Sequence, residues 1–260
     1  MIRPDRDHAG VAHARAVAGP PSGGPATALA DVCARRAAVY EVLTYGFSEP
    51  SAPYVKALAS GDIAALLRDA VSWLRAGAVA YEPALAALAE AGSKLNTAGG
   101  ARALSDLRVD HARLFTGPGR PLIMCYASEY LDAGEGLPRR LNTGATAAAE
   151  AAYIAEGVSP STASSDLPDR VTTELEFLYH LCRREEAAWA ADDEVEATRL
   201  RRSLDAFLRG HAGLWMPRFA ASVRALAEQG VYVAIAELLR VHLAMELGAT
   251  APGRPASPGQ

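Results

Sequence analysis

The sequence lacks the features of a membrane or secreted protein. No apolar run approaches the roughly 18 to 20 residues that a membrane-spanning helix requires. Arg3, Arg6 and Arg15 stand near the N-terminus, but the apolar stretch of a signal peptide does not follow them. The residues therefore predict a cytoplasmic protein without stable membrane insertion.

Cysteine is scarce. The chain has three cysteines, Cys33, Cys125 and Cys182, and none of them forms a C-x-x-C pair. An odd number without paired spacing indicates a reducing compartment rather than a disulfide framework. Cys182 falls on an apolar helix face and Cys125 lies in an apolar segment, so both thiols are expected to be structural.

Charge of either sign is not concentrated anywhere in the chain. The 26 basic and 30 acidic residues are interspersed, the formal net charge is −4, and no long basic run occurs. Surfaces that bind nucleic acid need clustered lysine and arginine, so we expect no nucleic-acid partner. A mildly acidic surface would tolerate a basic peptide.

The short motifs of common enzyme classes are also missing. The chain has no G-x-S-x-G, no phosphate-binding P-loop and no H-E-x-x-H. Residues 117–121 are rich in glycine, but their prolines remove amides that a phosphate cradle needs. We therefore expect neither catalysis nor a cofactor.

Three histidines, His111, His211 and His242, fall on apolar helix faces. Imidazole is a common metal ligand, but no two of them have the i, i+3 or i, i+4 spacing that metal-binding helices often use. We expect hydrogen-bonded core histidines and no metal site. A metal-dependent enzyme built on these histidines and Glu174 is the alternative.

What the chain does contain is helix. Alanine, the best helix former, is abundant, half of the residues are apolar, and no alternating strand pattern is convincing. The sequence predicts an all-α protein: a single globular bundle of about ten helices over residues 26–247, between disordered tails at 1–25 and 248–260. The predicted helices are 27–47, 51–59, 62–76, 81–97, 100–116, 144–156, 169–190, 193–211, 213–228 and 230–247.

Several helix ends have an identifiable cause in the sequence. Ser51 and Asp62 are candidate N-caps, because short polar side chains accept from the free amides of a first turn. The candidate C-terminal caps, where a left-handed residue is favoured, are Gly77, Gly157 and Gly248.

Two segments interrupt the helical pattern. Residues 117–143 are rich in glycine and proline but also apolar and aromatic, and residues 158–168 form a more polar loop. Long loops in compact domains are usually functional or disordered, and the first loop is too apolar for disorder. We expect it to pack on the body of the protein and to meet the second loop.

Glu174 falls inside the apolar arc of the helix predicted from residue 169. A buried carboxylate must be paired or hydrogen-bonded, so we expect a partner, either an arginine or free backbone amides. A structural clamp and a site carboxylate are both open readings. Glu176 and His180 fall on the opposite face, where we expect a solvated pair.

Several short segments occur in an order and spacing found in one known family. They are Arg36, Tyr40, Leu43, Phe47 and Pro50; Arg113-Leu114-Phe115 with Gly117-Pro118 (R-L-F-x-G-P); Tyr126, Ser128, Glu129 and Tyr130 (loosely P-Y-E-S-x-Y, with the order of Glu and Ser shifted); Asp166-Leu167-Pro168-Asp169-Arg170 (E-P-P-D-H) followed by residues 174–178; and Phe207-Leu208, His211, Trp215, Pro217 and Phe219 (F-L-x-x-H…W-x-P-x-F). Together they resemble the TorD/DmsD family of cytoplasmic chaperones for molybdenum redox enzymes.

This sequence departs from the family pattern at two positions of the fourth segment. Arg170 stands where the family has histidine, and Asp166 replaces the leading glutamate. Arginine is a permanent cation, so a hydrogen-bond-accepting role of that histidine does not transfer. Arg170 would repel a peptide carrying two arginines unless it pairs with Asp166 or Asp169.

The resemblance implies a binding protein. Its expected partners are the apo catalytic subunit of a molybdopterin oxidoreductase and the twin-arginine signal peptide of that subunit, which the chaperone holds until cofactor insertion and export. Such a peptide has two arginines before an apolar stretch, so its reader needs carboxylates beside an apolar groove. The expected site residues are Tyr126, Ser128, Glu129, Tyr130, Asp166, Pro168, Asp169, Arg170 and Glu174. Capping of the following helix is the structural alternative for Asp169.

Other readings stay open. The chain could be a helical scaffold or regulator that binds another protein through the same groove. Some family members are proposed to bind a nucleotide or the molybdopterin cofactor, but this sequence shows no motif for either. The protein could be a monomer or a dimer, since long loops between helices permit helix exchange.

Overall fold

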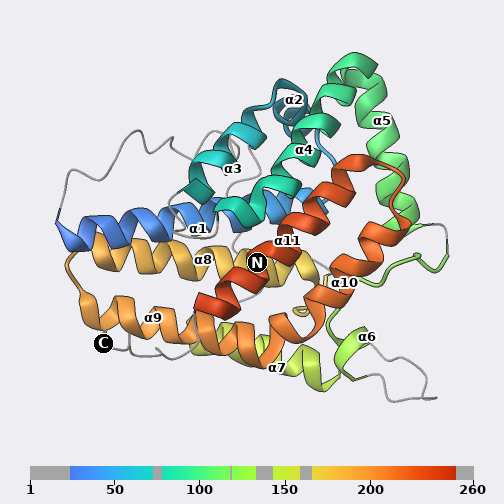
Figure 1. The fold of residues 1–260 in the computed structure, drawn as a ribbon. Helices are drawn as coiled ribbons and strands as arrows, with labels where there is room; N and C mark the ends of the chain where they lie inside the picture. The colour runs from blue at the N-terminus through green and yellow to red at the C-terminus, as the bar shows by residue number, and fades with distance from the viewer. Residues whose placement is uncertain (1–23, 73–77, 118, 133–142, 159–165, 250–260) are drawn as a thin grey trace, which may run out of the picture.

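The computed structural model of the chain describes residues 24–72, 78–117, 119–132, 143–158 and 166–249, and these form helices without a named strand (Figure 1). The prediction of an all-α protein of about ten helices is confirmed. The α-helices are α1 (Pro25–Phe47), α2 (Ala52–Ser60), α3 (Asp62–Ser72), α4 (Ala78–Ala98), α5 (Gly100–His111), α6 (Ser128–Leu131), α7 (Gly144–Ala155), α8 (Val171–Ala190), α9 (Glu194–Phe207), α10 (Gly213–Leu226) and α11 (Gly230–Ala249). Two turns of π-helix, at Ala112–Thr116 and Leu208–Ala212, continue α5 and join α9 to α10.

The long helices α1 and α8 lie side by side and have the most extensive contact in the fold (Figure 1). Helix α9 packs on α8, and α11 crosses the bundle against α4 and α10. Helices α2 to α5 pack on one another at one end of this arrangement. The remaining short helices, α6 and α7, contact each other, and α6 also contacts α10.

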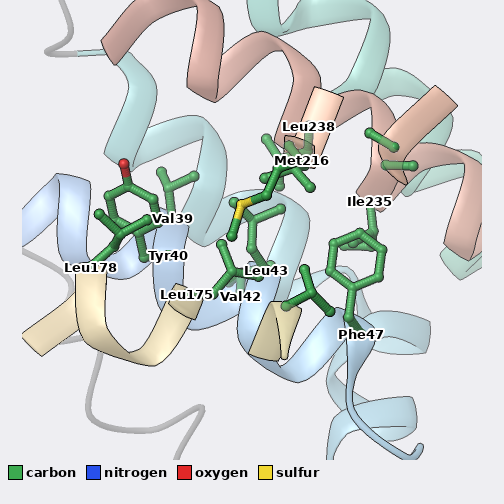
Figure 2. Close-up of a cluster of buried hydrophobic side chains, with 14 of the residues drawn as sticks. Val39, Tyr40, Val42, Leu43, Phe47, Leu175, Leu178, Met216, Ile235 and Leu238 are labelled. Atoms are coloured by element: carbon green, nitrogen blue, oxygen red, sulfur yellow. The ribbon is translucent and has the colours of Figure 1, made fainter. Parts of the chain in front are cut away.

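The centre of the bundle is aliphatic and aromatic. Helix α1 contributes Val39, Leu43 and Phe47, which meet residues of α8, α10 and α11 such as Leu175 and Met216 (Figure 2). Burying side chains of this size stabilises a fold by about 1.5 to 3 kcal/mol each, before the entropic cost of ordering them. The core thus spans α1, α8, α10 and α11, and it fixes the frame on which the loops rest.

A buried ionic cluster crosses the same four-helix region. Arg36 of α1 donates from Nε and Nη2 to the two carboxylate oxygens of Glu246 in α11, at 2.8 and 2.7 Å, and from Nη1 to Glu185 of α8 at 3.0 Å. All three side chains are buried. This fork-to-fork pairing joins three helices and leaves neither carboxylate without a cation.

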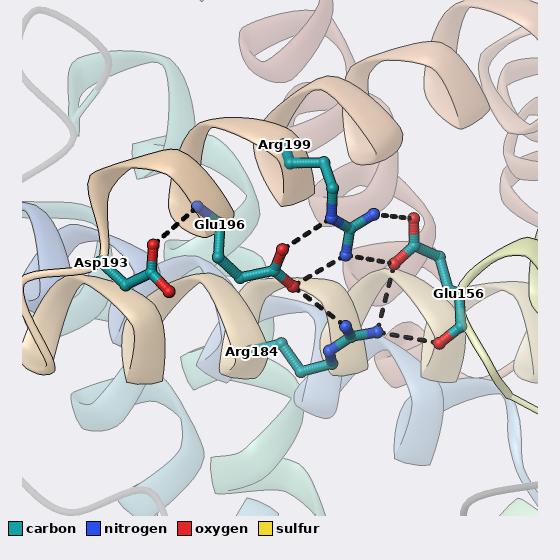
Figure 3. Close-up of polar contacts among 5 residues, drawn as sticks. All are labelled: Glu156, Arg184, Asp193, Glu196 and Arg199. Atoms are coloured by element: carbon teal, nitrogen blue, oxygen red, sulfur yellow. Dashed lines mark hydrogen bonds and ion pairs between the residues drawn. The ribbon is translucent and has the colours of Figure 1, made fainter.

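A second ionic cluster connects the end of α7 to α8 and α9 (Figure 3). Glu156, next to the end of α7, accepts from Arg184 at 3.1 Å and from Arg199 at 2.8 and 3.0 Å, while Glu196 accepts from both arginines. Asp193 caps α9 by accepting from the amide of Glu196 at 3.0 Å. These contacts hold α7 against α8 and α9.

Most helix ends lie where the sequence places them, with some corrections. Ser51 caps α2, accepting from Tyr54 N at 3.4 Å, and Gly157 follows α7 with φ 69°. Asp62 is not an N-cap: it is the first residue of α3, and Gly61 with φ 84° precedes it. Gly248 lies inside α11 and does not end it. Gly77 and the outer parts of the predicted tails, residues 1–23 and 250–260, lie outside the described residues.

Gly92 marks a close approach of α4 to α2. A Cβ atom at this position would lie 2.3 Å from the carbonyl oxygen of Leu58, which belongs to the backbone and cannot move aside cheaply. We expect Gly92→Ala to lower the free energy of unfolding by about 1 to 3 kcal/mol, measured by urea denaturation. The control is Gly100→Ala in α5, where a Cβ meets nothing within 4 Å. Equal stability of the two variants would contradict this packing.

Candidate functional site

Residues 125–127 of the first predicted loop contact residues 169–171, which directly follow the second predicted loop at 158–168. Tyr126 and Arg170 form an isolated antiparallel bridge. Beside it, the amide of Ala127 donates to Asp169 O at 2.9 Å, and the amide of Val171 donates to Cys125 O at 2.8 Å. These backbone hydrogen bonds join residues 125–128 to residues 166–171, where α6 and α8 begin. We call these two segments together the loop junction.

Asp169 lies at the centre of the loop junction and is fully buried. Its Oδ2 accepts from the amide of Ser128 at 2.9 Å, the first residue of α6, whereas its Oδ1 is buried without a hydrogen-bond partner. The structural reading of Asp169 as a cap of the helix that follows it needs correction. The carboxylate instead satisfies a free amide at the start of α6 and binds one loop to the other.

Glu174 lies one turn into α8 and is fully buried. Its two oxygens bind His211 Nε2 at 2.8 Å and Trp215 Nε1 at 2.9 Å. The prediction of an arginine or backbone amides as the partner of Glu174 is therefore wrong. Its partners are a histidine and a tryptophan from the α9–α10 region. This triad supports the loop junction from the interior.

Glu174 and His211 both bind a proton more tightly than the free side chains do. Burial raises the pKa of Glu174 to about 7, with the hydrogen bonds from His211 and Trp215 opposing it. Burial would lower the pKa of His211, but the bond to the Glu174 carboxylate outweighs it and raises that pKa. Both pKa shifts favour the protonated form. Glu174 and His211 therefore share one proton at pH values above 4.5, where a free glutamate would be ionised.

Above this buried frame the loop junction offers half-buried side chains. Tyr126, Tyr130, Asp166, Pro168 and Arg170 all retain partial exposure. Arg170 pairs with Asp166 at 2.5 Å, which offsets the cation that would otherwise repel a basic peptide. The half-exposed part of the loop junction is therefore aromatic and electrically balanced.

Tyr130 connects α6 to α10. Its hydroxyl donates to Met124 O at 3.0 Å, its ring lies 5.3 Å from that of Trp215, and the guanidinium of Arg218 lies 5.5 Å from the ring centre. Arg218 also donates to Tyr130 O at 3.0 Å. The tyrosine thus extends the apolar lining of the loop junction toward α10.

The structure brings eight of the nine expected residues to the loop junction or its immediate neighbour α6, and Glu174 lies beneath it. Four of the nine are buried: Ser128, Glu129, Asp169 and Glu174. These positions suit residues that hold the surface in shape, whereas the half-exposed five suit direct contact. The sequence interpretation missed Arg218 as a neighbour of Tyr130, and no pattern within residues 213–226 indicates that contact.

Three further buried polar residues, Asp110, His111 and His242, have interior partners. Asp110 accepts from the amides of Glu228 and Gln229 at 3.0 and 2.7 Å and from Arg113, which ties the end of α5 to the α10–α11 turn. His111 contacts Phe47 O at 3.4 Å and His242 contacts the Tyr81 hydroxyl at 2.8 Å. The prediction of hydrogen-bonded core histidines is confirmed.

The cysteines are all free and buried, and burial raises the pKa of Cys125 and of Cys182 to about 12, so these thiols stay protonated. Glu176 and His180, expected as a solvated pair, are half-buried and form no contact with each other. Within the described ranges no group of three or more His, Cys, Asp or Glu is arranged as metal ligands, and no helix there is long and apolar enough to cross a membrane.

Comparison with known proteins now identifies the family. The profile described as nitrate reductase delta subunit matches residues 78–221, from α4 into α10, which include the loop junction and the Glu174 triad. The chain belongs to the nitrate reductase delta subunit family. This family groups with the TorD-like maturation chaperones of redox enzymes, so the resemblance found in the sequence is confirmed. The family consists of assembly chaperones rather than enzymes.

One curated relative of this delta-subunit-family protein is the selenate reductase assembly chaperone protein of Thauera selenatis. The two are 38% identical over 91 residues, which are 34% of this chain and 45% of the relative. The match thus spans less than half the length of that protein. No solved structure matches the delta-subunit-family chain.

Proposed function

We propose that this protein is a cytoplasmic assembly chaperone for the catalytic subunit of a molybdopterin oxidoreductase. It binds the apo subunit, including a twin-arginine signal peptide, and holds it until the cofactor is inserted and the subunit is exported. The described chain carries this out as one helical domain, over residues 26–247. Family membership and the name of the selenate reductase relative support the class of client.

The observation that carries the proposal is the construction of the loop junction. A fully buried carboxylate, Asp169, and the Glu174 triad fix two loops whose upper side chains are aromatic and half-exposed. Such a surface is rigid beneath and presents aromatic rings beside a neutralised ion pair above, which suits the recognition of an extended or helical apolar segment at low entropic cost. Tyr126, Tyr130 and Pro168 contact the client, and the buried residues hold them in place.

The experiment is recovery of the client from cells under mild conditions. Tagged native protein is compared with Tyr126→Ala and with Asp166→Asn. We expect the native protein to recover a molybdopterin oxidoreductase subunit and each variant to recover at least about tenfold less, the factor that the loss of one well-placed contact produces. The matched controls are Val195→Ala in α9 and Glu150→Gln in α7, both at exposed positions away from the loop junction.

The possible outcomes separate the functions. Recovery of the subunit by all variants would keep the chaperone function and move its site. Consistent recovery of a different protein, weakened by the same two substitutions, would favour a helical scaffold or regulator using this surface. Gel filtration of each variant must match the native protein, so that loss of folding is not read as loss of binding.

A further inference from the structure

The Glu174 triad is connected to the α6 side of the loop junction through two aromatic rings. The indole of Trp215 donates to Glu174 at 2.9 Å, and its ring lies 5.3 Å from the ring of Tyr130. The hydroxyl of Tyr130 donates in turn to Met124 O at 3.0 Å. Because interiors are close-packed, a displacement of Trp215 acts directly on Tyr130, a side chain proposed above to contact the client.

A second series of contacts runs from the triad to the other segment of the loop junction. The imidazole of His211 stacks on Phe207, with ring centres 5.1 Å apart. The ring of Phe207 lies 6.2 Å from that of Tyr153 in α7, and the Tyr153 hydroxyl donates to Pro168 O at 2.8 Å. The triad therefore acts on both sides of the loop junction, at Tyr130 and at Pro168.

A turn of π-helix, Leu208–Ala212, places His211 against the buried carboxylate. The imidazole is 6% exposed, and its Nε2 atom lies 2.8 Å from Glu174. Turns of π-helix are rare and occur frequently at functional sites, because they place a side chain where a regular helix would not. The position of His211 is thus a specific feature of this fold.

The proton of the Glu174–His211 pair offsets negative charge in this interior. Glu174 and Asp169 are both fully buried, and His211 interacts electrostatically with each of them. The one arginine of the loop junction, Arg170, is paired with Asp166 at 2.5 Å. The imidazole of His211 therefore supplies positive charge to two buried acids at once.

Two further ionisable groups face the triad. Asp132, next to the end of α6, interacts with His211 and favours its protonated form. The Tyr153 hydroxyl of α7 interacts with Glu174 and Asp169, but burial raises the pKa of Tyr153 well above its ordinary value, so this group stays neutral. Neither group can replace the proton of the pair.

Release of this proton to solvent would disturb the loop junction itself. With the proton, Glu174 and His211 together have no net charge, and without it a buried carboxylate faces that of Asp169. Buried like charges repel, and an uncompensated buried charge is costly. Asp169 accepts from the amide of Ser128 through its carboxylate and from that of Ala127 through its backbone oxygen, both at 2.9 Å. Displacement of Asp169 would therefore separate the two segments.

We propose that His211 is a positioning residue of the client site: the proton that it shares with Glu174 holds the loop junction in the shape that binds the client, and loss of that proton releases the client. The inference concerns regulation of the surface described above, and it rests on the proposed chaperone function. The two series of contacts and the pair of buried acids support it.

Client binding should weaken as the pH rises from 6 to 8. Burial raises the pKa of Glu174 to about 7. Burial would lower the pKa of His211, but the bond to Glu174 outweighs it and raises that pKa. A pair that titrates near pH 7 keeps its proton in about 90% of molecules at pH 6 and in about 10% at pH 8. Because apparent affinity follows the fraction of the competent form, it should fall about tenfold.

The first test is recovery of the molybdopterin oxidoreductase subunit at pH 6 and at pH 8. The native protein should recover about tenfold less of it at pH 8. In Glu174→Gln the amide cannot ionise, and His211 loses the carboxylate that raises its pKa, so recovery should be nearly equal at the two pH values. Glu174→Gln should then exceed the native protein at pH 8, which a substitution that only disturbs packing cannot do.

The matched control is His180→Gln in the same helix, α8. His180 is half-buried and interacts with Arg184 and Glu156, and it takes part in neither series of contacts. Burial lowers the pKa of His180, so its titration lies below the range tested. The native tenfold ratio should persist in this variant.

Hydrogen–deuterium exchange tests the loop junction without a client. The amides of Ala127, Ser128 and Val171 are hydrogen-bonded between the two segments. After correction for the intrinsic exchange rate at each pH, their protection in the native protein should fall about tenfold from pH 6 to pH 8. In Glu174→Gln it should stay constant.

The outcomes separate this proposal from the chaperone function. Client recovery and amide protection that are equal at both pH values in the native protein would overturn the proposal and leave the chaperone function intact. A tenfold ratio that persists in Glu174→Gln would overturn it too, because the controlling proton would then bind elsewhere. Protection that depends on pH, without recovery of the subunit at either pH, would overturn the chaperone function and, with it, the role of this proton in client release.

Discussion

Arg36→Met is expected to lower the free energy of unfolding by about 3 to 5 kcal/mol, the cost of leaving a buried charge without its partner. The substitution removes the only described cation that donates to both Glu185 and Glu246, and both carboxylates are buried. Arg201 cannot replace it, because its guanidinium lies 3.8 Å from Glu246 at the edge of the cluster. Urea denaturation at pH 7 measures the loss.

The same cluster sets a pH dependence. Burial alone would raise the pKa of Glu246, but Arg36 outweighs it and lowers that pKa from 4.5 to about 2. A carboxyl with a depressed folded-state pKa stabilises the fold above its unfolded pKa and loses that contribution as the pH falls toward the folded value. The native protein should therefore lose about 3 kcal/mol between pH 4.5 and pH 2 from this group.

The control for Arg36 replaces the whole cluster. In the triple variant Arg36→Met, Glu185→Leu, Glu246→Leu no buried charge stays behind, and Arg201 at the edge keeps its pairing with Asp205 at 3.0 Å. Most of the lost stability should therefore return. This triple variant should also lose the acid-dependent contribution of Glu246. A single Arg36→Met variant as stable as the native protein at pH 7 would contradict the buried ion cluster.

Glu174→Ala is expected to cost about 3 to 5 kcal/mol, because it leaves the buried nitrogens of His211 and Trp215 without an acceptor and opens a cavity. Glu174→Gln should cost far less. The amide oxygen can accept from Trp215 Nε1, and the amide nitrogen can donate to neutral His211. The comparison of the two variants by urea denaturation separates the loss of hydrogen bonds from the loss of charge.

The Glu174 triad also predicts how stability changes around neutrality. The folded-state pKa of Glu174, about 7, is above its ordinary 4.5, so its contribution is complete below pH 4.5 and is lost as the pH rises to about 7. The pKa of His211 is raised by the Glu174 carboxylate, so the two residues share this proton and the contribution of His211 is part of the same loss. Stability should fall from pH 5 to pH 8 in the native protein and less steeply in Glu174→Gln. A parallel pH profile in both proteins would contradict the shared proton.

Helix periodicity made most of the fold predictable. The apolar stripe of α8 alone predicts that Glu174 lies in the core, because a period of 3.6 residues fixes which side chains share a face. The identity of its partners was not predictable in this way. His211 and Trp215 lie far along the chain, and periodicity within one helix contains no information about which face of another helix it meets.

The loop junction was predictable in outline and not in detail. The apolar character of residues 117–143 indicated that this loop packs on the bundle. Its backbone bridge, however, is with residues 169–171, which the sequence assigned to a helix beginning at residue 169. Burial of Glu129 was not predictable, because α6 has only four residues and so no periodic pattern that reveals its inner face. Burial of Asp169 was not predictable either, because it lies before the first residue of α8, outside any helical repeat. The expectation that both acids bind a peptide directly assumed exposed loop positions.

The π-helical turn at Leu208–Ala212 was also absent from the predicted helices, and it matters for comparing relatives. A π turn holds one more residue than an α turn, and Gly213 permits it, since a Cβ there would lie 2.6 Å from Leu208 O. The turn sets the angular position of Trp215 relative to α9. A relative that lacks this single extra residue would rotate its tryptophan by about 100° around the helix axis, away from the buried glutamate. Alignments of this family should therefore allow a one-residue gap between α9 and α10. The position of that gap should be chosen so that the tryptophan aligned with Trp215 can still bind the glutamate aligned with Glu174, rather than by the lengths of α9 and α10.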